Sequence, residues 1–144
     1  RSISTGRDKT DMGWEIYPEG LSQLLIRLKE EYGVKKIYIA ENGAAFNDHV
    51  NQEGEVLDDD RIHYLSLHLK EVQKAIQEGV NVRGYFLWSL MDNFEWAEGY
   101  SKRFGIIHIE YNTLKRTLKK SGMWYKKVIE TGNIISIQEE LNNR

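Results

Sequence analysis

The sequence predicts an α/β fold with parallel strands that belongs to a larger structure. Helix-type and strand-type patterns alternate along the first 90 residues, an order typical of right-handed βαβ units. The run from residue 80 to 90 is almost wholly apolar, as in a strand covered on both faces. A complete eight-stranded α/β barrel takes roughly 200 residues or more, so 144 residues are too few to form one.

The first helix is expected over residues 18–33 and the first strand over residues 34–41. Apolar side chains recur at the i, i+3, i+4, i+7 spacing of one helical face, namely Leu21, Leu24, Leu25, Leu28 and Tyr32. Pro18 suits the first turn of this helix, and Gly33 suits its end. The segment VKKIYIAE is rich in β-branched and aromatic residues and runs into an Asn-Gly turn, which predicts a strand.

A polar loop over residues 42–60 leads to a second helix and a second strand. Three successive aspartates close the loop as candidate helix caps. Apolar residues then step by three and four positions, as Ile62, Leu65, Leu69, Val72 and Ile76. This spacing, with a glycine at its end, predicts a helix over residues 61–79. The apolar strand over residues 80–90 follows it directly.

The rest of the chain predicts a loop, one strand and a last helix. The expected ranges are 91–102 for the loop, 103–111 for the strand and 121–130 for the helix, with Gly132 at its end. We expect residues 1–132 to form one segment of a single domain and residues 133–144 to form a tail.

A pair of parallel strands has unsatisfied edges. Such a pair leaves hydrogen-bonding groups open, and a strand that is apolar on both faces lacks cover on at least one side. We therefore expect the chain to complete something larger. The alternative is a small α/β domain that folds alone by means of additional strands.

Composition excludes several classes of protein. The formal charge of −2, from 20 basic and 22 acidic residues, gives no general attraction to nucleic acid or to an anionic membrane. The lack of cysteine removes disulfides and thiolate metal sites. No window approaches 18 consecutive apolar residues, and the first six residues hold no signal-type apolar run. A membrane span and secretion are therefore not indicated, and the cytoplasm is the default location.

Two further patterns receive structural interpretations. Six basic residues lie between residues 115 and 127, around Trp124 and Tyr125. That chemistry suits nucleic acid, but the balanced charge and the lack of a binding motif favour a solvated face beside a packed tryptophan. The four histidines show no i, i+4 pairing, so no metal site is expected.

Glu41 is the first candidate for chemistry. It ends the first predicted strand, directly before Asn42 and Gly43. In parallel α/β folds, functional residues gather at the carboxyl ends of strands, where loops from several strands meet one ligand. A carboxylate at that junction can act as a nucleophile or as a base, although a solvated turn residue gives the same pattern.

A cluster of aromatic and polar residues follows the second strand. Its members are Trp88, Asp92, Asn93, Phe94, Glu95, Trp96, Tyr100 and Phe104. Sugars present hydroxyls at their rim and C–H groups on their faces, and flat aromatic rings beside carboxylates match both surfaces. We expect Phe94 to pack in the core and the Glu95-Trp96 pair to be functional.

Five motifs, in this order, resemble the C-terminal part of a glycoside hydrolase family 1 β-glucosidase. They are TDMGWEIYPEGL, IYIAENGAA, DDDRIHYLSLHL, GYFLWSLMDNFEWAEGYSKRFGI and KKSGMWYKKVI. The resemblance implies a (β/α)₈ TIM barrel of a retaining β-glycosidase. This chain would supply the last two barrel strands, the surrounding helices and the loops on one side of the active site. The N-terminal portion of the enzyme would complete the barrel.

The resemblance also implies roles for individual residues. Glu41, in the run IAENG, matches the catalytic nucleophile. The implied sugar contacts are the hydroxyl-binding Glu95 and Trp96, the stacking platform Trp88, the pocket wall Phe104 and the leaving-group contact Trp14. No metal and no cofactor are implied.

The second carboxylate of a retaining mechanism is missing from the sequence. Retaining enzymes use two carboxyl groups about 5–5.5 Å apart. In this family the acid/base glutamate lies in an Asn-Glu-Pro motif, whereas the only proline here is Pro18, which follows Tyr17. We expect the N-terminal portion, on another chain or upstream of Arg1, to supply it, and the 144 residues alone to be inactive.

The expected activity is hydrolysis of terminal non-reducing β-D-glucosyl residues, from a β-glucoside or a cellobiose-type sugar, as in cellulose degradation. Relatives that act on 6-phosphorylated sugars use Ser, Lys and Tyr for the phosphate, at positions where this sequence has Glu95, Lys102 and Phe104. A carboxylate repels phosphate, so an unphosphorylated glycoside is expected. The sequence does not decide between gluco-, galacto- and fuco-configured sugars, because Glu95 could bridge to hydroxyls in either orientation. The alternative function is a non-catalytic carbohydrate-binding remnant of the same fold.

Overall fold

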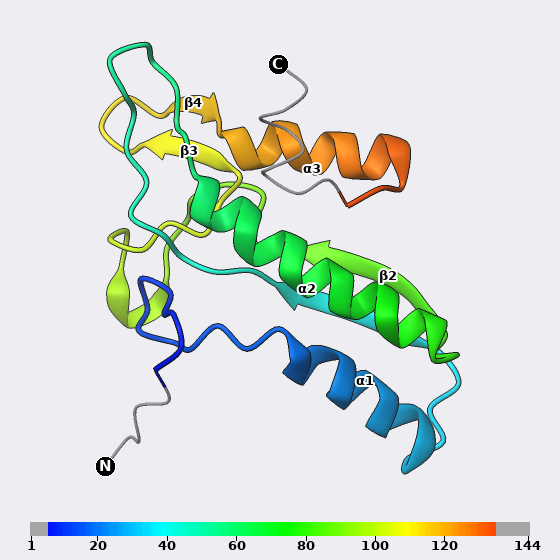
Figure 1. Cartoon of the computed structure of the whole chain (residues 1–144). Coiled ribbons are helices and arrows are strands. Elements are labelled where there is room, and N and C mark those ends of the chain that lie inside the picture. The colour runs from blue at the N-terminus through cyan, green and yellow to red at the C-terminus, as the bar shows by residue number, and fades with distance from the viewer. Residues whose placement is uncertain (1–5, 135–144) are drawn as a thin grey trace.

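The computed structural model describes residues 6–134. Its elements are α1 (Glu19–Glu30), β1 (Ile37–Asn42), α2 (Asp59–Gln77), β2 (Val82–Leu87), the 3₁₀ helix η1 (Trp96–Glu98), β3 (Ile107–Glu110), β4 (Lys115–Leu118) and α3 (Lys120–Thr131). In Figure 1, β1 and β2 run beside α2, with β3, β4 and α3 at one end. Each predicted helix and strand is present, and β4 is an element that the sequence analysis missed.

The first two strands form a parallel pair, as predicted. Their register places Ile39 of β1 beside Tyr85 of β2, and the pairing continues to Asn42 and Leu87 at the carboxyl ends. Helix α2 provides the crossover between them, which is the βαβ arrangement.

The second sheet is an antiparallel hairpin of β3 and β4, with His108 beside Thr117. The strand predicted over residues 103–111 is shorter than expected and begins at Ile107. The residues before it bond to the segment after β2 instead. The Ser89 N–H donates to the Phe104 carbonyl (3.1 Å), and the Ile106 N–H donates to the Ser89 carbonyl (2.9 Å).

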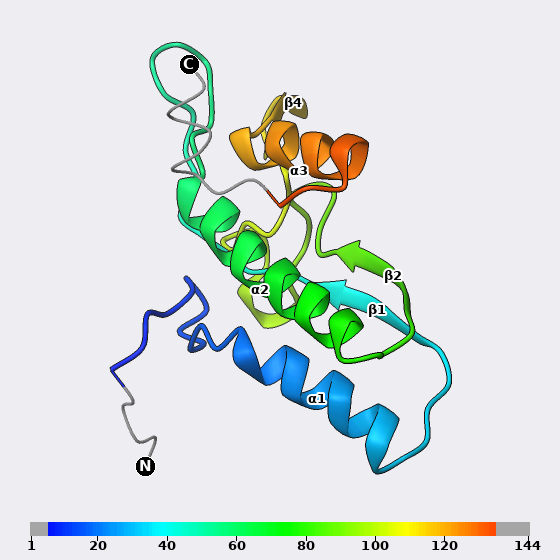
Figure 2. The same cartoon turned by 45° about the vertical axis from the view of Figure 1, so that its right-hand side comes forward.

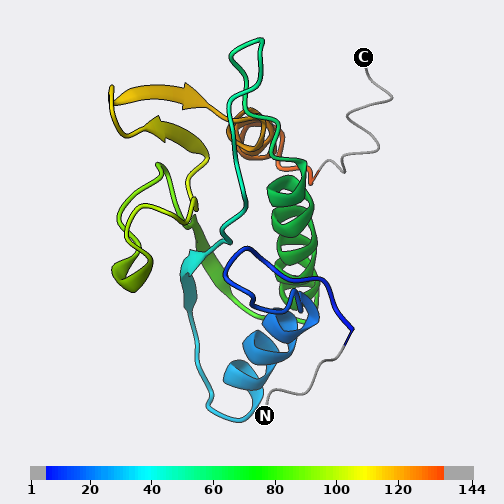
Figure 3. The same cartoon turned by 90° about the vertical axis from the view of Figure 1, so that its left-hand side faces the viewer.

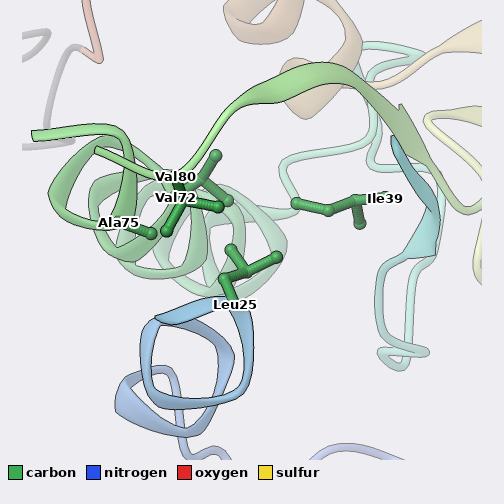
Figure 4. Packing of buried hydrophobic residues seen from close by; sticks show 5 residues of the cluster. All are labelled: Leu25, Ile39, Val72, Ala75 and Val80. Carbon is green, nitrogen blue, oxygen red and sulfur yellow. The ribbon is translucent and has the colours of Figure 1, made fainter. Parts of the chain in front are cut away.

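Helices α1 and α2 cover one side of the β1–β2 sheet (Figures 2 and 3). The first core cluster between them consists of Leu25, Ile39, Val72, Ala75 and Val80. Figure 4 shows Leu25 of α1 pointing toward the side chains from α2. Full burial of a side chain of this size stabilises the fold by about 1.5–3 kcal/mol. Leu24, Tyr32 and Ile76, which belong to the predicted apolar stripes, remain exposed at their edges.

A second core cluster joins α2 to α3 and to the loop after β1. Its buried members include Ile62 and Leu65 of α2, Ala44 of the loop and Trp124 of α3. Trp124 is fully buried, so the prediction of a packed tryptophan within the basic stretch is confirmed.

The sheet face away from the helices carries exposed aromatic side chains. Tyr38 of β1 and Phe86 of β2 are 57% and 59% exposed. They flank Gly84, where an added Cβ would lie 2.8 Å from the Tyr38 ring. Within the described part of the chain, no element covers this face of the β1–β2 sheet.

None of the helices within residues 6–134 is long and apolar enough to cross a membrane. The tail predicted over residues 133–144 lies mostly outside the described residues. The division of the chain at residue 132 stays a prediction.

Candidate active site at the carboxyl ends of the parallel strands

A cavity of about 320 Å³ opens at the carboxyl ends of β1 and β2. Its lining residues are Trp14, Glu41, Asn42, Gly43, Tyr64, Trp88, Glu95, Trp96 and Phe104. All six residues that the sequence analysis selected are among them. They come from five separate segments of the chain, so the fold brings them together over as many as 90 residues of sequence (Trp14 to Phe104).

Two backbone segments of the cavity lining, at Asn42–Gly43 and at Trp88, approach each other closely. The Trp88 N–H donates to the Asn42 carbonyl (2.9 Å) and so extends the ladder beyond the end of β2. At Gly43, an added Cβ would lie 1.6 Å from the Trp88 carbonyl oxygen. Only glycine allows this approach. Glu41 and Trp88 therefore both line the cavity at the two strand ends, and the Trp88–Ser89 peptide bond is cis.

Glu95 and Trp96 occupy a tight turn in the loop after β2. The Glu95 N–H donates to the Gly99 carbonyl (2.6 Å), and the Glu98 N–H donates to the Glu95 carbonyl (2.8 Å). Trp96 adopts φ +38°, a region that few residues other than glycine enter. The turn leaves Trp96 83% exposed and Glu95 half-buried, both at the cavity.

Phe104 and Trp14 form a third part of the wall. Their ring centroids are 6.1 Å apart, and the planes are tilted by 49°. Phe104 is buried and Trp14 is 52% exposed. The pair therefore combines a fixed inner ring with an outer indole that is open to solvent.

The prediction that Phe94 packs in the core is wrong. Phe94 is 55% exposed and contacts the ring of Tyr100 edge-on, with centroids 5.5 Å apart. The loop turns inward at Asp92 instead, because the Asp92 carboxylate accepts hydrogen bonds from the Gly105 N–H (3.0 Å) and the Ile109 N–H (3.3 Å). This anchor leaves Phe94 on the outside.

Sequence reasoning missed Asn42, Gly43 and Tyr64 as pocket residues. Tyr64 reaches the pocket from α2, where its helical spacing gave no sign of a role. Its ring stacks on His68 with centroids 3.9 Å apart. Burial raises the pKa of Tyr64, so its hydroxyl stays protonated at neutral pH.

Six buried charges hold the loops that carry the pocket. This charge cluster consists of Asp48, Asp58, Asp92, Arg61, Arg103 and Lys119, whose side chains are at most 20% exposed. The Lys119 ammonium lies 2.5 Å from an Asp48 oxygen and 2.8 Å from an Asp92 oxygen. Asp48 follows β1 and Asp92 follows β2, so Lys119 ties the two loops together.

Arginines complete the charge cluster. Arg61 binds both oxygens of Asp48, at 3.1 and 2.7 Å, and one oxygen of Asp58 at 2.8 Å. Arg103 binds Asp92 at 2.7 Å. Burial acts to raise the pKa of Asp92, but Lys119 and Arg103 outweigh burial and lower it. Three acids and three bases thus balance each other, as buried charges must.

The cavity offers two carboxylates, three indoles, one phenyl ring, one phenol and one amide. This set can accept hydrogen bonds from sugar hydroxyls and stack against sugar faces. Within residues 6–134, no group of three or more His, Cys, Asp and Glu side chains is arranged to hold a metal ion.

Parallel strands with a crossover helix, and a pocket at their carboxyl ends, are typical of α/β enzymes, the α/β barrels among them. The family model "Glycosyl hydrolase family 1" matches residues 3–134. The chain belongs to this family.

Individual relatives agree with that assignment. The 1,4-beta-D-glucan glucohydrolase of Thermotoga neapolitana is 57% identical over 126 residues, which cover 88% of this chain and 28% of that protein. The 6-phospho-beta-galactosidase of Leptotrichia buccalis is 50% identical over 135 residues, 93% of this chain and 29% of that protein. The structure of the family 1 β-glucosidase from Thermotoga maritima in complex with isofagomine lactam matches with a TM-score of 0.88 and 55% identity, over 89% of this chain and 29% of that one.

The chain therefore spans less than a third of the length of these relatives. It holds part of their barrel, and the fold predicted by the resemblance is confirmed to that extent.

Proposed function

We propose that this chain supplies the nucleophile and the sugar-binding loops of a retaining β-glucosidase. The enzyme would hydrolyse terminal non-reducing β-D-glucosyl residues. The observation that supports this proposal most strongly is the convergence of all six selected residues on one cavity at the strand ends. In α/β barrels, that end carries the active site.

The proposed reaction has two displacements at the anomeric carbon. A carboxylate oxygen of Glu41 attacks, a Glu41–sugar ester bond forms, and the bond to the leaving oxygen breaks. The acid/base residue donates its proton to that oxygen. In the second step, the acid/base removes a proton from water, the water oxygen attacks the same carbon, and the ester bond breaks.

The other pocket residues would position the sugar for attack. The Trp88 indole provides a surface for stacking. Glu95 accepts hydrogen bonds from sugar hydroxyls, and the Trp96 N–H donates one. Phe104 closes the inner wall, and the exposed Trp14 faces the leaving group.

The acid/base has to come from outside the described residues. Glu41 and Glu95 are the two carboxylates that line the cavity within residues 6–134, and Glu95 is assigned to the sugar hydroxyls. We infer that the N-terminal portion of the same enzyme supplies the acid/base.

A hybrid enzyme tests the proposed function. In this hybrid, residues 3–134 replace the matched segment of the Thermotoga maritima β-glucosidase. We expect it to hydrolyse 4-nitrophenyl β-glucoside, and Glu41→Gly to lower kcat by at least about 10⁴-fold, or roughly 5.5 kcal/mol. Azide, which can enter the space of the lost side chain, should restore turnover and give the α-glucosyl azide, identified by NMR.

Glu53→Gly, which removes an exposed carboxylate of the loop after β1, is the matched control and should keep full activity. Turnover that survives Glu41→Gly without azide would remove Glu41 from its role. A folded hybrid that binds glucose analogues but never turns over would favour the carbohydrate-binding remnant.

A further inference from the structure

The side chain of Asn42 connects three elements directly beside Glu41. The Tyr85 hydroxyl of β2 donates to Asn42 Oδ1 at 2.7 Å. Asn42 Nδ2 donates to the Tyr64 hydroxyl of α2 in a longer contact of 3.5 Å. The Asn42 backbone carbonyl accepts the Trp88 N–H at 2.9 Å. One residue at the end of β1 thus bonds to β2, to α2 and to the segment that carries Trp88.

Both tyrosines are well-fixed partners. Tyr85 packs against the first core cluster, and Tyr64 is a buried member of the second. Burial raises the pKa of each phenol, so each hydroxyl keeps its proton at neutral pH. The Tyr85 hydroxyl is therefore a permanent donor, held by the core, toward the Asn42 amide oxygen.

In the described part of the chain, the Glu41 carboxylate differs from its neighbour Asn42. Within residues 6–134, no hydrogen bond or ion pair to its carboxylate is present, whereas Asn42 beside it is bonded through both side-chain polar atoms. The described residues therefore hold Glu41 through its backbone. That backbone is fixed on its C-terminal side by Asn42 and by the close approach of Gly43 to Trp88.

We propose that Asn42 and Tyr85 are positioning residues for the attack by Glu41. Their hydrogen bond fixes the backbone at the end of β1, and this fixes where the Glu41 carboxylate points. The inference rests on the proposed function. A misplacement of about 1 Å between reacting groups can cost about 100-fold in rate, so a lost bond in this place should affect chemistry more than binding.

The test measures the attack step alone in the hybrid enzyme. With 2-deoxy-2-fluoro-β-glucosyl fluoride, Glu41 displaces fluoride and forms a long-lived ester, whose formation mass spectrometry follows. Tyr85→Phe removes one oxygen atom. We expect the maximal first-order labelling rate to fall at least tenfold, while the reagent concentration for half-maximal rate changes less than threefold.

Two controls separate positioning from stability. Tyr32→Phe removes the same atom from a tyrosine that is 65% exposed. Val72→Ala weakens the first core cluster far from the strand ends. Both variants should label within twofold of the parent rate. A Val72→Ala variant as slow as Tyr85→Phe, at an equal loss of Tm, would overturn the proposal.

Asn42→Ala is a second variant that removes the same hydrogen bond, and it tests the proposal even where Tyr85→Phe does not fold. It should slow labelling at least as much as Tyr85→Phe, and Tyr85→Phe should add less than twofold in the Asn42→Ala background, because the two residues act through one bond. Independent effects that multiply would overturn the inference. A parent hybrid that is folded but not labelled at Glu41 contradicts the proposed function itself, whereas a labelled parent with an unaffected Tyr85→Phe contradicts only this inference.

Discussion

Glu95 brings a second carboxylate to the cavity, and its charge bears on which sugars can enter. Lys102 does not offer a free positive charge, because its ammonium lies 3.1 Å from an Asp11 carboxylate oxygen and donates to the Asp11 carbonyl at 2.8 Å. Phe104 has no hydroxyl to offer. A like charge about 4 Å away costs about 4 kcal/mol at an effective dielectric constant of about 20. These contacts support the proposal of an unphosphorylated substrate, although one relative is named a 6-phospho-beta-galactosidase.

In the hybrid enzyme, kcat/KM for 4-nitrophenyl β-glucoside should exceed that for its 6-phosphate by at least about 100-fold, or roughly 2.7 kcal/mol. Glu95→Ser should narrow this ratio at least tenfold, because it removes the repelling charge. Glu98→Ser, which changes an exposed acid outside the cavity in the same turn, is the control and should leave the ratio unchanged. A parent hybrid that prefers the phosphorylated sugar contradicts the assignment.

The location of the pocket residues could be predicted because each lies at the end of a recognisable strand or within a distinctive motif. Glu41 and Trp88 follow β1 and β2, and the parallel pairing brings strand ends together. Tyr64 could not be predicted as a pocket residue, because a helical pattern does not show which side chain of the helix reaches a pocket at the strand ends. Phe94 was misjudged because hydrophobicity alone does not show which side of a loop faces inward.

Among the connections between elements, the charge cluster is the most consequential. Lys119 directly precedes α3, and its ammonium bonds to the loops that follow β1 and β2. In the same way, Asp58 before α2 accepts hydrogen bonds from the Ser121 N–H (2.8 Å) and the Ser121 hydroxyl (2.5 Å) of α3. The starts of α2 and α3 are thus fixed to their neighbours by charge as well as by apolar contact.

Lys119→Met should lower the free energy of unfolding of the hybrid enzyme by about 3–5 kcal/mol, because it leaves two buried carboxylates without their shared partner. Urea unfolding measures the change. Lys126→Met, in an exposed pair with Glu130 at 3.7 Å on the same helix, should cost less than about 0.5 kcal/mol. Equal losses of unfolding free energy in the two variants would show that the buried ion pairs stabilise the fold no more than an exposed pair does.

Helices α1 and α2 could be predicted because their apolar spacing is regular over several turns. Strand β4 could not, since the run KRTL has one apolar residue and no alternation. Its pairing with β3 arises from the turn between them. The six-charge cluster was equally invisible, because its members are spread over more than 70 residues of sequence (Asp48 to Lys119) and each one looks like an ordinary surface residue.

The two faces of the β1–β2 sheet differ in how well they are covered. Helices cover one face of the β1–β2 sheet, while Tyr38 and Phe86 on the other face are exposed. A further hollow of about 610 Å³, with walls that include Leu90, Met91 and Ile109, opens beside Trp88. Apolar surfaces of this kind mark sites of contact with other protein. They fit contact with the remaining strands of a barrel. In the relatives, the part of the protein outside the matched segment is more than twice as long as that segment.

The purified 144-residue chain should show no hydrolysis of 4-nitrophenyl β-glucoside, because within residues 6–134 Glu95 is the one carboxylate that lines the cavity besides Glu41, and Glu95 is assigned to the sugar hydroxyls. Addition of the complementary N-terminal segment of the Thermotoga maritima β-glucosidase should produce activity, measured as release of 4-nitrophenol. The same mixture made with the Glu41→Gln chain should stay inactive. Turnover by the chain alone would disprove the proposal that the N-terminal portion supplies the acid/base.

The balanced charges around Lys119 also limit how such a gene can recombine. A crossover between the codons for Asp48 and Lys119 joins segments from two parents, and each parent must then provide charges that neutralise those of the other. Where the two parents carry different charges at these positions, a crossover that separates paired positions leaves a buried charge with no counterpart. Productive exchanges should therefore fall outside this interval, and the interval should pass between lineages as a single block.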